Sequence, residues 1–253
     1  TGGGCRATNY IGLIRKALAD AGFSNVPVIS LNFSGLEKEQ AFKFTVPLLN
    51  KVLQAVVYGD LLAKLLYATR PYEVKKGSSI RLYNKWMKKC NDSLKKGVIS
   101  EYKNNIKEIV NDFKKVPVLF INKPKVGIVG EILIKYHPFG NNFVAELLEK
   151  EGAEVIIPEF MGFVKYILAN EIKKNTYLKT GDFKAKVYGK VIEFLDNVQD
   201  GYRKAIMSSK KGYFKPSDIL ELADYAEEIL STGNQTGEGW LLTGEMVEFL
   251  KHG

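Results

Sequence analysis

The feature that most constrains the fold lies in the second half of the chain, where two short β-type runs flank one helical segment. The runs "KVGIVGEI", from Lys125, and "AEVIIPE", from Ala153, both have the pattern of a buried strand. Between them, "NNFVAELLEKEG" predicts a helix with Asn141 as its N-cap and Gly152 at its end. Strands joined through a helix pair in parallel, with a right-handed connection. This unit therefore predicts an α/β fold.

Helical periodicity dominates the rest of the sequence. It predicts helices at 11–21, 44–70, 79–95 and 100–115, a short strand at 26–32, and a mostly helical region at 160–231, followed by a final helix from 241 to 250. We therefore expect Rossmann-like parallel sheet layers with a large helical content, arranged as two α/β subdomains. The first, residues 1–120, would be the remnant of an α/β subdomain with a helical segment. The second, residues 121–253, would be a Rossmann-like subdomain.

Composition and charge restrict the class of protein. The 253 residues are 45% hydrophobic, which is enough for a globular core. The net charge is +9, but only five of the 37 basic residues are arginine. Nucleic-acid readers usually rely on clustered arginine forks, so we expect a solvated lysine surface, or attraction for a polyanion such as a CoA ester, and no nucleic-acid partner. No apolar run approaches the roughly 20 residues of a membrane span, so no membrane partner is expected either. Two cysteines make no disulfide framework, which favours a reducing cytoplasm.

The opening "TGGGCRATNY" places Cys5 after three glycines and before a predicted helix. Backbone N–H groups at a helix start and the positive charge of Arg6 favour a thiolate there. Three interpretations stay open: a metal or iron–sulfur ligand, an anion-binding turn with a bystander cysteine, and a tight turn that needs only a small residue. The second cysteine, Cys90, lies mid-helix and is interpreted as an ordinary helix residue.

Two further segments contain candidate functional residues. "GIVGEILIKYHPFGNN" follows the first predicted strand, and the carboxyl edge of a parallel sheet is where α/β proteins bind ligands. Its Glu131 is a candidate acid/base group or polar anchor, and equally a helix cap; His137 is a weak candidate metal ligand. "QTGEGWLLTGEM" has Gly237, Glu238 and Gly239 before a helix, where backbone amides can face a ligand, or where Glu238 only favours the helix dipole. The chain contains none of the common hydrolase, metalloprotease or phosphate-loop motifs.

Three stretches resemble the 2-hydroxyacyl-CoA dehydratase D-component family, and within it the CoA-substrate-specific enzyme activase-related proteins of anaerobic bacteria. They are "TGGGCRATNYIGLIRKAL", "VGIVGEI…HPFGNNFVAELLEKEGAEV" and "GEGWLLTGEM", which occur in this order across almost the whole chain. The resemblance implies Rossmann-like domains that hold a 4Fe-4S iron–sulfur cluster through cysteines from separate segments. It also implies an acyl-CoA substrate, an ATP-dependent activator protein or domain as partner, and elimination of water after one-electron reduction of the thioester.

Carried over by position, the resemblance makes Cys5 a metal ligand. It implies close backbone or side-chain approach to the cofactor by Gly3, Gly4, Arg6, Gly237 and Gly239. The candidate catalytic residues near the acyl-thioester pocket are Glu131, His137 and Glu238. Family members carry further cysteines before the first motif and after the final helix, and this chain starts at Thr1 rather than Met. The sequence is therefore expected to be a fragment that lacks the cluster and is inactive alone. The alternative is a non-catalytic scaffold module that binds CoA or the activator, with the lysines of 79–115 as docking face.

Overall fold

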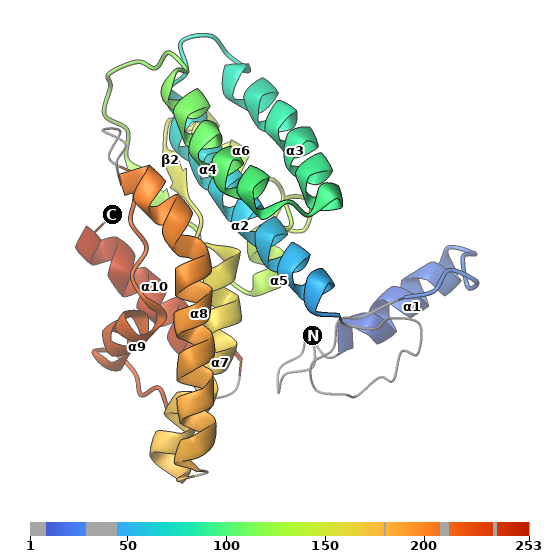
Figure 1. Ribbon diagram of the computed structural model, residues 1–253, viewed down its shortest axis with the longest axis vertical. Helices are drawn as coiled ribbons and strands as arrows, with labels where there is room; N and C mark the ends of the chain where they lie inside the picture. Colours follow the sequence, from blue (N-terminus) through green and yellow to red (C-terminus); the bar gives the residue numbers. More distant parts are fainter. Residues whose placement is uncertain (1–8, 29–44, 180, 208–212, 235–236, 253) are drawn as a thin grey trace.

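The structure is a computed structural model (Figure 1), and it describes residues 9–28, 45–179, 181–207, 213–234 and 237–252. In chain order its helices are α1 (Tyr10–Asp20), α2 (Val46–Thr69), the 3-10 helix η2 (Arg70–Tyr72), α3 (Ser78–Lys96), α4 (Ile99–Lys114), α5 (Ile132–Tyr136), α6 (Val144–Lys150), α7 (Phe160–Leu178), α8 (Asp182–Met207), α9 (Ile219–Glu227) and α10 (Gly239–His252). The strands are β1 (Lys125–Gly127) and β2 (Glu154–Ile156).

The expected Rossmann-like fold with two α/β subdomains is wrong. About 70% of the described residues are helical, and the sheet within the described residues is a single parallel pair of strands. Of the strand predicted at 26–32, residues 26–28 are not in a strand and the others lie outside the described residues. In the described part of the chain from 160 onward the apolar residues recur at helical spacing with no strand between them, so burial is achieved helix on helix. The division between 120 and 121 stays a prediction.

The predicted order of strand, helix and parallel strand is confirmed, but the burial predicted for the first strand is wrong: β1 has three residues, and Lys125 and Gly127 are exposed. β1 and β2 pair in parallel with Lys125 opposite Glu154, and α6 lies between them in sequence. Gly152 ends α6 with a positive φ of 98°, and the next residue's N–H, at Ala153, bonds back to the Leu148 carbonyl at 3.0 Å. Asn141 contributes from farther back than predicted: the N-cap position is Phe143, yet the Asn141 Oδ1 accepts the Val144 N–H at 3.2 Å.

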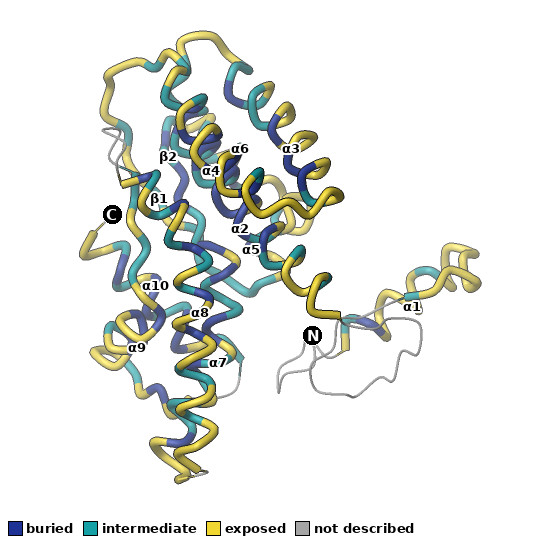
Figure 2. The backbone as a smooth tube through the Cα atoms, viewed as in Figure 1, coloured by how far each residue is buried: buried dark blue, intermediate teal, exposed yellow. Residues whose placement is uncertain are grey.

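The helical core, as we name it, is the apolar cluster that α2 forms with α3, α4, α7 and α8. α2 is apolar on most of its faces, and Thr45 caps it by accepting the Leu48 N–H at 3.3 Å. α3 and α4 are amphipathic helices that turn their apolar faces inward. Their inward residues, such as Trp86 and Phe113, are buried. In Figure 2 the buried residues concentrate where these helices meet.

The stretch Val46–Tyr72 has the length and composition of a membrane-crossing helix, with a mean hydropathy of 1.2 over its most apolar window. Half of that window is buried inside the protein, and Leu61, Leu62 and Leu65 are fully enclosed by neighbouring helices. α2 therefore has the surroundings of a central core helix rather than of an exposed span.

A second apolar cluster joins α7, α9 and α10. The closest approach is at Gly244 of α10, where a Cβ atom would lie 2.3 Å from the carbonyl oxygen of Leu222 in α9. Trp240 fixes the start of α10, because its indole N–H donates to Asn170 of α7 at 2.9 Å. These contacts pack α10 against α9 and join its first turn to α7. Glu245 and Glu248 of α10 line the same cavity as Ile156 at the end of β2. Figure 1 shows α9 and α10 side by side.

Candidate functional site

A cavity of about 650 Å³ lies at the carboxyl end of β2. Its wall includes residues of α2, the segment between β1 and α6, the residues that follow β2, and the inner faces of α7, α8 and α10. A volume of this size suits a small-molecule ligand. Lys135, Tyr136, Pro138 and Asn141 line it, so the segment that the sequence singled out after β1 does contribute to the cavity.

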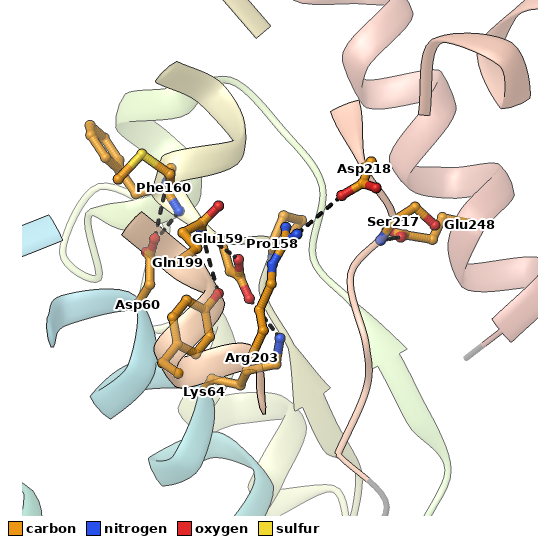
Figure 3. Close-up of polar contacts among 12 residues, drawn as sticks. Asp60, Lys64, Pro158, Glu159, Phe160, Gln199, Arg203, Ser217, Asp218 and Glu248 are labelled. Carbon is orange, nitrogen blue, oxygen red and sulfur yellow. Dashed lines mark hydrogen bonds and ion pairs between the residues drawn. The ribbon is translucent and has the colours of Figure 1, made fainter. Parts of the chain in front are cut away.

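Asp60 of α2 lines the cavity and forms hydrogen bonds with the first residues of α7. Its two carboxylate oxygens accept the N–H groups of Phe160 at 2.8 Å and of Met161 at 3.0 Å (Figure 3). Burial, and next the negative charge of Glu159, raise the pKa of Asp60 to about 7. Asp60 thus joins two helices that are distant in sequence, and its carboxyl group can gain or lose a proton near neutral pH.

Glu159 is the ionised member of this carboxyl pair. Burial is the largest single influence and would raise its pKa. The ammonium group of Lys64, 2.7 Å away, together with the hydroxyl of Tyr202 and the charge of Arg203, outweighs burial and holds the pKa below the ordinary value. The amide of Gln199 donates to its other oxygen at 3.0 Å. Figure 3 shows these side chains converging from α2, α8 and the turn after β2. The carboxylate is therefore fully paired and fixed in position.

Arg203 of α8 lines the same cavity. Its Nη1 lies 3.0 Å from Asp218 and 3.7 Å from Asp196, whereas its Nε–H is buried and has no hydrogen-bond partner among the described residues. Lys165 of α7 pairs with Asp196, and burial, together with the charge of Arg203, lowers its pKa. Two cations therefore lie side by side in the wall, and one of them keeps a buried donor unused.

A further pair of charged residues lies in the cavity wall, where α10 faces α5. Lys135 and Glu245 form a buried ion pair with Nζ–Oε distances of 3.0 and 3.1 Å. Burial raises the pKa of Glu245 to about 7, against the opposing charge of Lys135. Glu248, one turn later, accepts the backbone N–H of Ser217 (Figure 3), and burial raises its pKa as well.

The structure places two of the predicted catalytic residues together, but at a helix end rather than in the cavity wall. The Glu131 carboxylate caps α5 by accepting the N–H groups of Leu133 at 2.9 Å and Ile134 at 3.2 Å. Glu238 accepts the N–H of Ile132 at 3.2 Å. Burial, and then the charge of Glu131, raise the pKa of Glu238. The capping role that the sequence left open for Glu131 is the one that these contacts support.

His137 lies at the other end of α5 and is exposed. Its Nδ1 accepts the N–H of Gly140 at 2.9 Å, so one ring nitrogen is used in a local turn. Gly237 has a positive φ of 75°, and its carbonyl accepts the hydroxyl of Tyr166. Gly239 is the first residue of α10. These contacts give both glycines a role in starting α10.

The iron–sulfur site cannot be built from the residues that the structure describes. Cys5, the predicted ligand, lies outside them, together with Gly3, Gly4 and Arg6. The described cysteine, Cys90, is buried in the helical core, and burial raises the pKa of its thiol to about 12, which disfavours the thiolate that binds iron. Within the described ranges no three His, Cys, Asp or Glu side chains gather in a metal-binding arrangement. The described residues therefore do not fit a cluster, and we derive no step through one.

Sequence reasoning missed most of the cavity's charged residues. A signal for them exists: Asp60 and Lys64 stand four residues apart inside the apolar run of α2, and Lys165 interrupts the apolar start of α7. Charged residues on a face that should be buried either pair with one another or contact a ligand. The partner residues could not be identified, because Glu159 lies 95 residues after Lys64 in the chain.

No family model, no curated protein and no solved structure matches this chain.

Proposed function

We propose that the cavity binds the acyl end of a CoA thioester, and that this chain is part of a cytoplasmic, 2-hydroxyacyl-CoA dehydratase-like protein that works with an ATP-dependent activator. The class of substrate and the partner come from the resemblance of three sequence stretches. The cavity adds a physical reason, because a pocket at the carboxyl end of a parallel pair is a favoured ligand position.

The observation that carries the proposal is the guanidinium group of Arg203, a residue of the cavity wall whose side chain is 17% exposed. A hydrogen bond from a charged donor contributes about 1.5–3 kcal/mol, so an acceptor that binds against this guanidinium group is favoured. The carbonyl oxygen of a thioester is such an acceptor. A guanidinium group at this oxygen also stabilises the negative charge that develops there when the thioester is reduced.

Two carboxyl groups of the cavity suit the proton transfers of a dehydration. Elimination of water needs a proton for the departing hydroxyl group, and a group is most effective when its pKa is near the working pH. Asp60 and Glu245 both have pKa values near 7. In this proposal one of them, protonated, gives its proton to the departing hydroxyl group, and the other, ionised, accepts the proton lost from C3 of the acyl chain. The cations of the wall hold the carbonyl end.

The direct test is calorimetric titration of the purified chain with a 2-hydroxyacyl-CoA, with CoA alone and with the free 2-hydroxy acid. We expect the thioester to bind at least tenfold more tightly than either part. The variant Arg203→Lys keeps a positive charge but loses the Nε–H, and it should weaken thioester binding by about tenfold. Arg81→Lys, on the exposed surface of α3, is the matched control. Equal affinity in the Arg203→Lys variant, or no binding to the wild-type chain, would contradict the proposal.

A non-catalytic scaffold that binds CoA or an activator is the second candidate. It is favoured by Glu131 and Glu238, whose carboxylates are occupied by backbone N–H groups. The docking face proposed from the sequence is weaker, because Lys89 and Lys96 pair with neighbouring acids. The titration separates the two candidates: a scaffold should bind CoA and its 2-hydroxyacyl thioester with equal affinity.

A further inference from the structure

An apolar stripe on the surface of α8, here named the α8 stripe, faces solvent along three helical turns. It consists of Phe183, Val187, Val191 and Phe194, whose exposed fractions are 80, 42, 38 and 55%. At 100° per residue these four positions fall within an arc of about 80° on the helix. Ile192 and Leu195 lie on another side of α8, which faces the protein interior and is buried. The stripe is therefore a second apolar face of α8, separate from the buried side of the helix, which packs against α7, α4 and α2. Figure 2 shows exposed residues along the length of α8.

The stripe is large enough to mark an interaction site. Taking about 200 Å² for a phenylalanine side chain, the four residues expose on the order of 400 Å² in a continuous strip. Isolated exposed apolar residues are common on soluble proteins, but a strip of this size is at the upper end for surfaces without a partner.

Lysines flank the stripe on both sides. By the same helical geometry Lys184 lies next to one edge, and Lys190 and Lys186 lie next to the other. All three are exposed, and none forms an ion pair with another described residue. The nearest acids of α8, Asp182 and Glu193, lie farther around the helix, beyond Lys186. An apolar stripe flanked by lysines is complementary to the apolar face of a partner helix that is flanked by acidic residues.

We propose that the α8 stripe docks an amphipathic helix with acidic flanks that belongs to a partner protein. The stripe spans about 16 Å, which is the length of three helical turns, and its 4-4-3 spacing matches the apolar ridge of one helix. The stripe's phenylalanines and valines supply burial, and the lysines supply orientation and salt dependence. This inference does not depend on the cavity or on what the cavity binds.

The test uses the full chain and a fluorescein-labelled probe peptide of about 18 residues, capped at both ends and based on alanine, a length at which alanine-rich helices form in water. The probe carries leucines at i, i+4, i+7 and i+11 and glutamates on both sides of them. A second peptide has lysine in place of each glutamate. Fluorescence anisotropy at about 50 and 300 mM NaCl measures the affinity of each peptide for the chain. We expect the acidic peptide to bind in the micromolar range, more weakly at high salt, and the lysine peptide not to bind.

Two variants with matched controls locate the contact. Phe183→Ser/Phe194→Ser should weaken binding of the acidic peptide at least tenfold, whereas Phe120→Ser, at a fully exposed phenylalanine outside α8, should leave it unchanged. Lys184→Glu/Lys190→Glu should weaken binding roughly tenfold at low salt and remove its salt dependence. The same charge change in Lys88→Glu/Lys103→Glu, on exposed positions of α3 and α4, should have little effect. All four positions on α8 are exposed, so circular dichroism should show unchanged folding.

Three results would overturn the proposal. The first is equal peptide affinity in the wild-type chain and the α8 variants. The second is a wild-type chain that dimerises in sedimentation experiments, does not bind the peptide, and becomes monomeric in Phe183→Ser/Phe194→Ser, because the occupant is then a second copy. The third is co-sedimentation with anionic phospholipid vesicles that the same variant abolishes, without peptide binding, because the stripe then contacts a lipid surface.

Discussion

The helical core and the cavity lie against the same helix, α2, and bury opposite kinds of side chain. On the side of α3 and α4, α2 contacts Trp86, Ile109 and Phe113, and the cluster is apolar. On the cavity side the same helix presents Asp60 and Lys64 to other charged groups. The difference shows where free energy of folding is gained and where it is spent: apolar burial stabilises, whereas buried charges are costly even when they are paired. Buried charges that gather beside a cavity are a pattern typical of binding and catalytic sites.

The largest expected effect comes from truncating the helical core. Phe113→Ala removes a fully buried ring between α4 and its neighbours, and we expect the free energy of unfolding to fall by about 3–5 kcal/mol. Urea denaturation followed by circular dichroism measures it. The exposed Phe120→Ala is the control and should change stability little. A loss below about 1 kcal/mol for Phe113→Ala would break the comparison, since the core would then contribute no more than the surface.

The second prediction concerns the buried ion pair at the cavity. Lys135→Met leaves Glu245 buried without its partner, and we expect a loss of about 3 kcal/mol at pH 7. The double variant Lys135→Met/Glu245→Leu should recover most of this loss, because no unpaired buried carboxyl group remains. Denaturation of the three proteins gives the coupling free energy. A double variant as unstable as the single one would mean that the pair stabilises the fold in its own right.

The third prediction is a pH dependence caused by Asp60. In the folded protein this carboxyl group keeps its proton up to about pH 7, whereas the ordinary pKa of 3.8 applies after unfolding. Between these two pH values the folded state binds more protons, so the contribution of Asp60 to stability decreases as the pH rises from about 4 to 7. Asp60→Asn cannot lose a proton, and its stability should decrease between pH 5 and 8 by about 2 kcal/mol less than that of the wild type.

Denaturation at pH 5, 6, 7 and 8 measures this difference, with Asp92→Asn on the exposed surface of α3 as the control. Glu245, whose pKa is also raised to about 7, contributes in the same direction in all three proteins and cancels from the comparison. Parallel pH profiles for the wild type and Asp60→Asn would show that Asp60 is ionised throughout this range.

The smallest effect is expected at Glu131, outside the cavity. Glu131→Ala removes the cap of α5 and should cost about 1 kcal/mol, whereas Glu131→Gln keeps an oxygen acceptor and should cost less. Both variants should bind a 2-hydroxyacyl-CoA as the wild type does. A Glu131→Gln variant that is stable but fails to bind the thioester would contradict the capping role as its main function. It would instead support the prediction from sequence that Glu131 belongs to the functional site.

The local elements were predictable from the sequence, and their assembly was not. The periodicity of α2, the β-α-β unit and the stop at Gly152 depend on residues close in sequence, so pattern and cap chemistry identify them. The number of strands in the sheet depends on pairing between segments that are distant in sequence. The pattern of one strand pair does not indicate whether further strands join that pair. The described residues of 160–231 are mostly helical, as the periodicity predicts, and they add no strand to the sheet.

The site was predictable only in part. The segment after β1 was singled out and does line the cavity, through Lys135 and Asn141, but the residues chosen from it, Glu131 and His137, do not. Asp60 and Lys165 are visible in the sequence as charges on apolar faces, yet their partners lie on other helices. The motif with the strongest chemical interpretation, around Cys5, lies outside the described residues, so that prediction stands untested.

The burial of Cys90 has a practical consequence. Its thiol lies in the helical core between α3 and α2, and its raised pKa makes it unreactive while these helices stay packed. A thiol-alkylating reagent can therefore label it only when this part of the protein opens. The labelling rate at increasing urea concentration would report the free energy of that opening, residue-specifically and without any engineered probe.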